Sequence, residues 1–170
     1  VSSIGRNAFS SCKELYFINI PESLLSLEQY AFNECTKLSK IALQGNITVI
    51  NKGTFNQCTS LKAVSIPNLV NRIEVDAFCY CTGLTTINIP SNVNLIKNGA
   101  FSMCTSLSEI KIHNITAYIE EDAFKDCTKL HSLPESCTIN YEKSEDGLEW
   151  GMNKNRTSLF IRGFRHMSNY

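Results

Sequence analysis

The sequence predicts an α/β fold: a right-handed solenoid of about six repeats with parallel strands, followed by a C-terminal β-hairpin segment. Three residue types that recur at one constant spacing predict it. A phenylalanine recurs at Phe9, Phe32, Phe55, Phe78, Phe101 and Phe124. A cysteine follows each at Cys12, Cys35, Cys58, Cys81, Cys104 and Cys127, and then a leucine at Leu15, Leu38, Leu61, Leu84, Leu107 and Leu130. Neighbouring members of every series are 23 residues apart, with no insertion or deletion.

A fixed period of this length, built on leucine and isoleucine, is the signature of leucine-rich repeats. One repeat alone buries too little apolar surface to offset the entropy lost in ordering its chain. Neighbouring repeats must therefore stack, so that equivalent side chains form continuous columns.

Within each repeat, an I-x-I segment predicts a strand because apolar and polar residues alternate. Three of these segments end directly before Pro21, Pro67 and Pro90, where a missing N–H costs little. The A-F-x-x-C-x-x-L segment has apolar residues at i, i+3 and i+6, which predicts a short helix or 3₁₀ turn on the convex side. The apolar pairs of the strands are Ile18/Ile20, Ile41/Leu43, Val64/Ile66, Ile87/Ile89 and Ile110/Ile112.

The repeat pattern decays after Leu133, which divides the chain into three parts. We predict that residues 1–136 form the leucine-rich-repeat solenoid and that the polar residues 137–147 form a connector. Residues 148–170 are predicted to form a β-hairpin that caps the stack or begins a following module. Its strands are expected at 148–152 and 158–164, around a turn at 153–156.

Composition excludes several classes of partner. Lysine plus arginine equals aspartate plus glutamate, at 16 each, so the formal net charge is zero and nothing global attracts a nucleic acid. The chain is 43% hydrophobic, yet no stretch approaches the roughly 18 apolar residues of a membrane span. We expect neither nucleic-acid binding nor membrane insertion within this segment.

The chain has eight cysteines, and we predict that those of the repeat column are free, buried thiols, protected in the folded chain, rather than disulfides. Six occupy one repeat position and would stack about 4.8 Å apart, the spacing of parallel strands. That exceeds the Cβ separation of roughly 3.5–4.5 Å that a disulfide prefers. No histidine recurs beside the column and no C-x-x-C is present, so we predict no metal and no cofactor. Cys79 and Cys137 lie off the column and are the candidates for reaction or pairing.

The repeat A-F-x-x-C-x-x-L-x-x-I-x-I-P resembles the BspA-type leucine-rich repeats over residues 4–134. The C-terminal W-G-M-N-K-N-R-T-S-L-F-I-R-G-F-R-H-M also resembles a block that precedes repeat arrays in that family, although Phe164 and Arg165 depart from its small residues. The resemblance implies a cell-surface or secreted protein whose repeats bind other proteins in adhesion or host contact, without a shared catalytic site. It also leads us to expect that further repeats flank this segment.

Strand alternation places the residues between and beside the apolar pairs on the exposed, concave sheet face. This face holds one carboxylate, Glu109, and one histidine, His131, too few for paired-acid or Ser-His-Asp chemistry. We therefore predict no enzyme, and we take the small polar face as the candidate protein-binding surface. Its candidate binding residues are Tyr16, Phe17, Asn19, Lys40, Lys62, Thr86, Asn88, Glu109 and Lys111.

Two readings of this face remain open at the level of sequence. Tyr16 and Phe17 are either an aromatic anchor for a partner or residues that a preceding repeat would cover. Lys40 and Lys62 are either partner contacts or solvated side chains. The protein as a whole is either a surface-exposed adhesion or recognition protein, with host or extracellular-matrix proteins as ligands, or an intracellular scaffold.

Three N-x-T triplets, at Asn46, Asn114 and Asn155, are glycan acceptors if the chain is secreted in a eukaryote. The high content of asparagine, serine and threonine produces about three such triplets by chance.

Overall fold

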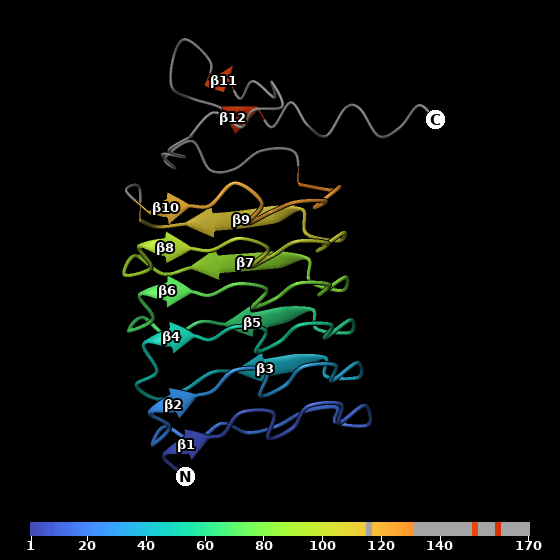
Figure 1. Ribbon diagram of the computed structural model, residues 1–170, viewed down its shortest axis with the longest axis vertical. Helices are drawn as coiled ribbons and strands as arrows, with labels where there is room; N and C mark the ends of the chain where they lie inside the picture. Colours follow the sequence, from blue (N-terminus) through green and yellow to red (C-terminus); the bar gives the residue numbers. More distant parts are fainter. Residues whose placement is uncertain (115–116, 131–150, 153–158, 161–170) are drawn as a thin grey trace.

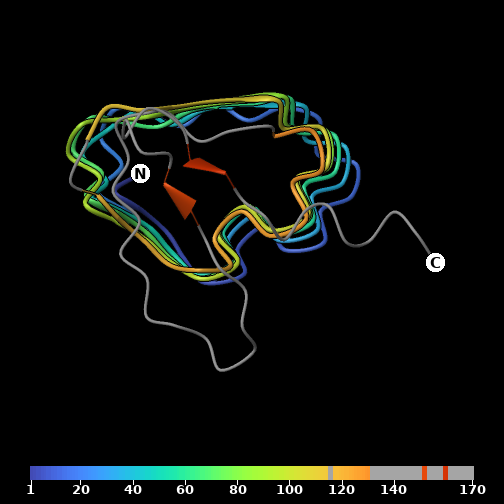
Figure 2. The ribbon, with the colours of Figure 1, turned by 90° about the horizontal axis from the view of Figure 1, so that it is seen from above.

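The computed structural model describes residues 1–114, 117–130, 151–152 and 159–160. The repeats lie one above another in a nearly straight stack, with strands on two sides of the coil (Figure 1). Seen along the stack, the backbones of successive repeats superpose closely (Figure 2). The predicted solenoid is confirmed, and each turn from the second to the fifth contributes two strands.

The two sets of strands differ in length. The short strands are β1 (Ser3–Ile4), β2 (Ser26–Leu27), β4 (Val49–Ile50), β6 (Arg72–Ile73), β8 (Leu95–Ile96) and β10 (Tyr118–Ile119). The long strands are β3 (Lys40–Ala42), β5 (Ala63–Ser65), β7 (Thr86–Ile89) and β9 (Glu109–Ile112). All pairs between these strands are parallel and in register one repeat apart, for example Ile87 with Ile110.

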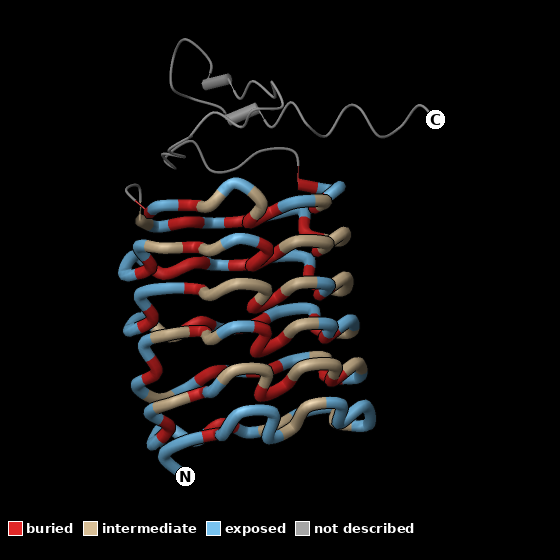
Figure 3. Tube along the Cα trace, in the orientation of Figure 1, coloured by how far each residue is buried: buried red, intermediate tan, exposed pale blue. Residues whose placement is uncertain are grey.

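The long strands confirm the prediction from the I-x-I segments. In β7 and β9 exposed and buried residues alternate strictly, with the isoleucines inside. The short strands were not predicted, because two residues are too few to show a period. They form because the isoleucine or leucine that opens each repeat is buried while the residue before it stays at the surface. Figure 3 shows this alternation along the tube.

The predicted helix or 3₁₀ turn at A-F-x-x-C-x-x-L is wrong: the described residues contain no helix, and this segment is a chain of tight turns. A helix would use its N–H groups internally. Here every second N–H bonds to the next repeat instead, as in Phe55 N to Ala77 O at 2.8 Å and Gln57 N to Cys79 O at 2.8 Å. The intervening groups close turns within the repeat, as in Cys58 N to Phe55 O at 3.1 Å.

Left-handed residues, two in each of the first five repeats and one in the sixth, make this alternation possible. One precedes the alanine or threonine of the turn, at Asn7, Tyr30, Gly53, Asp76 and Gly99. The other precedes the cysteine, at Ser11, Glu34, Gln57, Tyr80, Met103 and Asp126. Their φ angles lie between 56° and 66°, a region that costs non-glycine residues free energy. The hydrogen bonds between repeats offset that cost.

Hydrogen bonds between repeats on both sides also explain the nearly straight stack. Helices are wider than strands, so a helical outer side would curve the stack around its strands. Here successive repeats are separated by the same strand-like distance on both sides of the coil, so the two sides have equal length and the stack does not curve. The predicted concave face is therefore flat in this direction, and we call it the long-strand face: the exposed residues on and directly before β3, β5, β7 and β9, with residues 16, 17 and 19 of the first repeat.

Columns of identical side chains fill the core. The rings of successive phenylalanines are stacked, with centroids 5.1 to 5.6 Å apart and interplanar angles of 0° to 14°. Phe32, Phe55, Phe78 and Phe101 are fully buried. The first repeat is more open, since Phe9 and Leu15 are only partly buried and Cys12 is exposed.

Near the C-terminus, β11 (Gly151–Met152) pairs antiparallel with β12 (Leu159–Phe160), and Gly151 lies opposite Phe160. This confirms a hairpin pairing within the predicted strands. The connector at 137–147, the turn at 153–156 and the decayed end of the sixth repeat lie outside the described residues, so the three-part domain division and the capping role stay predictions.

We expect Phe78→Ala to lower the free energy of unfolding by about 3–5 kcal/mol, because it leaves a cavity in the middle of the ring column. Chemical denaturation followed by circular dichroism measures this. The matched control is Tyr80→Ala, which removes a ring that is 46% exposed and should cost about 1 kcal/mol or less. Equal losses in the two variants would contradict the stacking argument.

Candidate functional site

The long-strand face presents the candidate binding residues that the sequence predicted to point outward, whereas His131 lies outside the described residues. Ile41, Val64, Ile87 and Ile110 point into the core, while their neighbours along the strands face solvent. All nine candidate binding residues are exposed: Tyr16, Phe17, Asn19, Lys40, Lys62, Thr86, Asn88, Glu109 and Lys111. Their placement on one surface is a finding, whereas their role in binding stays a prediction.

The strand register fixes which of these residues are neighbours. Phe17 forms an isolated parallel bridge with Lys40, and Lys40 in turn pairs with Ala63. At the other end, Thr86 pairs with Glu109. The two long-strand pairs are joined by a longer backbone hydrogen bond, Thr85 N to Lys62 O at 3.4 Å. The face is thus one continuous surface with a looser junction between β5 and β7.

Charge is distributed unevenly along this face. Glu109 and Lys111 form an ion pair at 3.2 Å between Oε1 and Nζ, so their charges compensate each other. Lys40 and Lys62 form no ion pair within the part of the chain that the structure describes. The half of the face nearer the N-terminus therefore carries two uncompensated positive charges.

The same half carries the most exposed aromatic side chains of the described residues. Tyr16 is 67% exposed and Phe17 is 62% exposed. The remainder of the face consists mainly of small or uncharged residues, such as Ala42, Ser65 and Asn88. Oδ1 of Asn88 accepts a hydrogen bond at 2.7 Å from Nε2 of His113, a contact that the sequence did not indicate.

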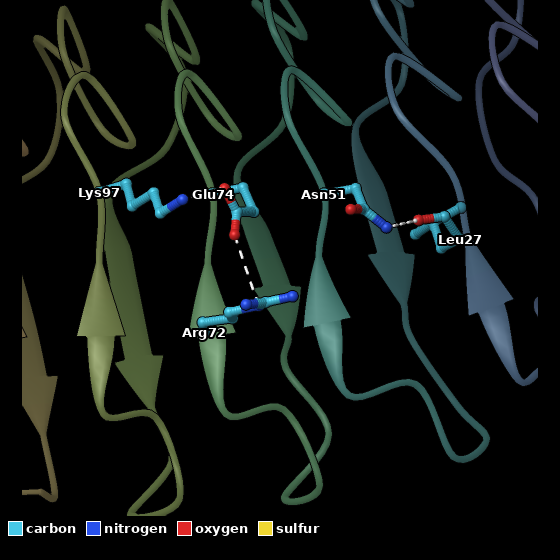
Figure 4. Close-up of polar contacts among 5 residues, drawn as sticks. All are labelled: Leu27, Asn51, Arg72, Glu74 and Lys97. Atoms are coloured by element: carbon cyan, nitrogen blue, oxygen red, sulfur yellow. Dashed lines mark hydrogen bonds and ion pairs between the residues drawn. The ribbon is translucent and has the colours of Figure 1, made fainter.

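Several polar side chains beside the short strands contact each other or the backbone (Figure 4). Glu74 lies 2.8 Å from Nζ of Lys97 and 3.4 Å from Nε of Arg72. Nδ2 of Asn51 donates to the carbonyl oxygen of Leu27 at 2.8 Å, where β2 and β4 are not paired as strands. These residues hold neighbouring repeats together, so we assign them a structural role.

From Cys35 to Cys127, each cysteine of the column donates its thiol to the phenylalanine carbonyl of the preceding repeat. Cys58 Sγ lies 3.1 Å from Phe32 O, and Cys81 Sγ lies 3.1 Å from Phe55 O. The Phe55 carbonyl also accepts from the N–H of Cys58 at 3.1 Å, so both of its lone pairs are used. The equivalent thiol bonds at Cys35, Cys104 and Cys127 are 3.0 to 3.2 Å long.

The thiols of the described residues are free, as predicted, and the column is buried from Cys35 to Cys127. The expectation that all six are protected is wrong for Cys12, which is exposed because no described repeat covers it. Burial raises the pKa of the Cys35 thiol to about 11 and that of Cys81 well above its ordinary value. Cys79 is only half-buried, but desolvation, with the nearby Asp76 charge, raises its pKa to about 11. Reactivity requires the thiolate, so neither Cys79 nor the buried thiols of Cys35 and Cys81 are poised for chemistry. Cys137 lies outside the described residues.

Other candidate sites can be placed briefly. Within the described ranges, no three or more histidine, cysteine, aspartate or glutamate side chains gather in a way that could hold a metal ion. A search of the same residues finds no helix with the length and apolarity to cross a membrane. Of the asparagines in N-x-T triplets, Asn46 is exposed, whereas Asn114 is half-buried and donates to Val93 O at 3.0 Å. Asn155 lies outside the described residues.

The fold and its exposed strand face define a β-solenoid of the leucine-rich-repeat class. The signature of the BspA type leucine rich repeat region matches residues 1–104 and 58–144, with six copies. The chain therefore belongs to the BspA-type leucine-rich-repeat family, as the resemblance implied. Leucine-rich-repeat proteins are generally non-enzymatic scaffolds for interactions with other proteins.

Solved structures support this assignment. A leucine rich cell surface protein from Faecalibacterium prausnitzii is 38% identical with a TM-score of 0.64, and the match covers 66% of this chain and 30% of that one. A leucine-rich repeat protein from Bacteroides ovatus is 28% identical with a TM-score of 0.68, and the match covers 81% of this chain and 42% of that one. A leucine rich repeat protein of T. pallidum is 25% identical with a TM-score of 0.59, and the match covers 65% of this chain and 63% of that one. The chain thus spans less than half of the first two relatives. No curated protein sequence matched.

We expect thiol titration of the folded chain to label Cys12 readily and the cysteines from Cys35 to Cys127 of the column hardly at all. Denaturation without reductant should release the five protected thiols, because they are buried rather than oxidised. Mass spectrometry after alkylation identifies the labelled positions. Protection that persists in denaturant until a reductant is added would show that the column contains disulfides.

Stability should fall above about pH 9, the ordinary pKa of a thiol. Above that pH the unfolded chain loses thiol protons that the folded chain keeps, since the folded pKa is raised. Each fully buried thiol then removes about 1.4 kcal/mol per pH unit until its folded pKa is reached. Below pH 9 both states are protonated and this effect is absent.

Denaturation at pH 7, 9 and 10 in the presence of reductant measures the slope. Cys81→Ser is the matched variant, because serine keeps a donor for Phe55 O but does not titrate in this range. Between pH 9 and pH 10 this variant should lose about 1 kcal/mol less stability than the unaltered chain, since the unfolded thiol is only half ionised at pH 9. Identical slopes would contradict the assignment of the effect to buried thiols.

Proposed function

We propose that this chain is a non-enzymatic, protein-binding segment of a cell-surface or secreted adhesion or recognition protein, and that it binds protein ligands on the long-strand face. The observation that carries the proposal is the contrast between the two sides of the coil. Beside the short strands, polar groups such as Glu74 and Asn51 are engaged in contacts between repeats. On the long-strand face, Tyr16, Phe17 and Lys40 are exposed.

The composition of this face suits recognition of a protein. Aromatic side chains supply large contact area and are enriched in interfaces, while small polar residues around them allow close approach. Two exposed rings stand beside Ser39 and Ala42, whose side chains are short. The similarity to a cell surface protein from F. prausnitzii supports display outside the cell. Host or extracellular-matrix proteins are the ligands that we propose.

An intracellular scaffold is the second candidate, and the thiols favour it. The described part of the chain holds seven free cysteines and no disulfide. Free thiols are typical of reducing compartments. Protease shaving of intact cells that produce the parent protein separates the two candidates: release of peptides from residues 1–130 supports surface display, and their full protection supports the intracellular scaffold.

We expect the Tyr16→Ser/Phe17→Ser double variant to weaken binding to a protein ligand at least tenfold, since exposed rings at an interface commonly contribute more than 1 kcal/mol each. Biolayer interferometry of the full chain against immobilised collagen, laminin and albumin measures this. The matched control is Tyr80→Ser/Tyr118→Ser, which removes two exposed rings elsewhere. Equal binding by both double variants, or no binding by the unaltered chain, would contradict the proposal.

A further inference from the structure

The uncompensated lysines of the long-strand face indicate what kind of partner it fits. Lys40 and Lys62 are exposed and form no ion pair within the described residues, although both lie on a face that also carries Glu109. Glu109 is paired with Lys111. It lies in the fifth repeat, at the position that Phe17 occupies in the first, so three repeats lie between the two residues. Lys37, near the same end, is already paired with Glu14 at 2.7 Å. Only Lys40 and Lys62 thus leave positive charge on this half of the face.

The register of the strands fixes the spacing of these two charges. Lys40 pairs with Ala63, the first residue of β5, and Lys62 directly precedes that strand. Neighbouring strands are about 4.8 Å apart and one residue rises about 3.3 Å, so the two lysine Cα atoms lie roughly 6 Å apart. In an extended chain, residues i and i+2 point to the same side and lie about 6.8 Å apart. Flexible lysine side chains easily span the small difference.

The residues around the two lysines allow an extended chain to lie close to the sheet. Ser39, Ala42, Ala63 and Ser65 all have short side chains, and the last three are exposed. Lys40 and Lys62 therefore project beyond their surroundings. The surface thus combines an area of short side chains with two lysines whose spacing matches that of residues i and i+2 in an extended chain.

We propose that this part of the long-strand face binds an extended acidic segment of a partner protein, with carboxylates at i and i+2 that pair with Lys40 and Lys62. This inference rests on the proposed function and names the chemistry of the ligand. Two exposed ion pairs are weak, since each changes affinity by roughly one- to fivefold. The segment is thus one part of a larger contact, and its order of charges provides specificity rather than strength.

The test uses the full ¹⁵N-labelled chain and capped peptides of equal length. The peptide T-E-T-E-T has its acids at i and i+2, T-E-E-T-T has them adjacent, and T-Q-T-Q-T has none. NMR titration at low salt detects weak binding and locates it. We expect T-E-T-E-T to shift the signals of Lys40 and Lys62, T-E-E-T-T to bind at least about threefold more weakly, and T-Q-T-Q-T not to bind.

Charge variants complete the test. Lys40→Glu/Lys62→Glu should weaken binding of T-E-T-E-T at least about tenfold, because attraction becomes repulsion. Lys52, an exposed lysine that follows β4 on the other side of the coil, provides the control Lys52→Glu, which should leave binding within twofold. Equal affinity for the two acidic peptides, or shifts away from Lys40 and Lys62, would overturn the inference.

Two further outcomes separate this inference from the function on which it rests. Binding of collagen or laminin that depends on Tyr16 and Phe17, without selective peptide binding, would sink the acidic-segment inference and leave the proposed function intact. Tight binding of heparin at Lys40 and Lys62, with no response to either acidic peptide, would also overturn it in favour of an anionic polysaccharide.

Discussion

The hydrogen bonds that run from each repeat to the next are the constraint on which this structure depends. A repeat of constant length brings every backbone group back to the same place one layer further on, so a donor in one layer always finds an equivalent acceptor in the next. On one side this produces the parallel strand pairs, such as Ile87 with Ile110. On the other side it produces bonds such as Phe55 N to Ala77 O. Because both sides repeat at a strand-like distance, the ring column between them can stack at 5.1 to 5.6 Å.

The cysteine column follows from the same constraint. Drawing the turn segment into the core leaves the second lone pair of each phenylalanine carbonyl buried, and a buried acceptor without a donor costs roughly 1–3 kcal/mol. Alanine would fill part of the space but donate nothing, and leucine would overfill it. A thiol is small and apolar enough for the core and still donates, as Cys81 does to Phe55 at 3.1 Å. The regular spacing of cysteine is therefore explained by backbone satisfaction, with no need for redox or metal chemistry.

Much of this architecture could be predicted from the sequence, because burial in a solenoid repeats with the chain. The columns of Phe, Cys and Leu, the inward I-x-I residues and the outward positions such as Lys40 and Asn88 follow from the period and from strand alternation alone. The turn segment could not be distinguished in this way, since i, i+3 and i+6 spacing suits both a helix and a series of tight turns. What decides between them is where the N–H groups bond, and that depends on the neighbouring layer. Left-handed residues at Tyr80 or Met103 give no sequence signal, because such residues seldom adopt that conformation. The contacts of Asn51 and Glu74 could not be predicted either, because each occurs in a single repeat and leaves no periodic pattern in the sequence.

This division between repeated and unrepeated residues also shows where recognition can reside. Every position that carries the stack is held nearly constant by its neighbours above and below, so it has no freedom to encode a ligand. The outward positions of the long strands are released from that requirement. Phe17, Lys40, Ala63, Thr86 and Glu109 occupy equivalent positions of successive repeats on the long-strand face, yet they share neither size nor charge. If stacking required identical side chains at these outward positions, they would be as uniform as the phenylalanines of the core. The variation means that the fold places no demand on this column, so its aromatic and cationic end is free to match a partner without cost to stability.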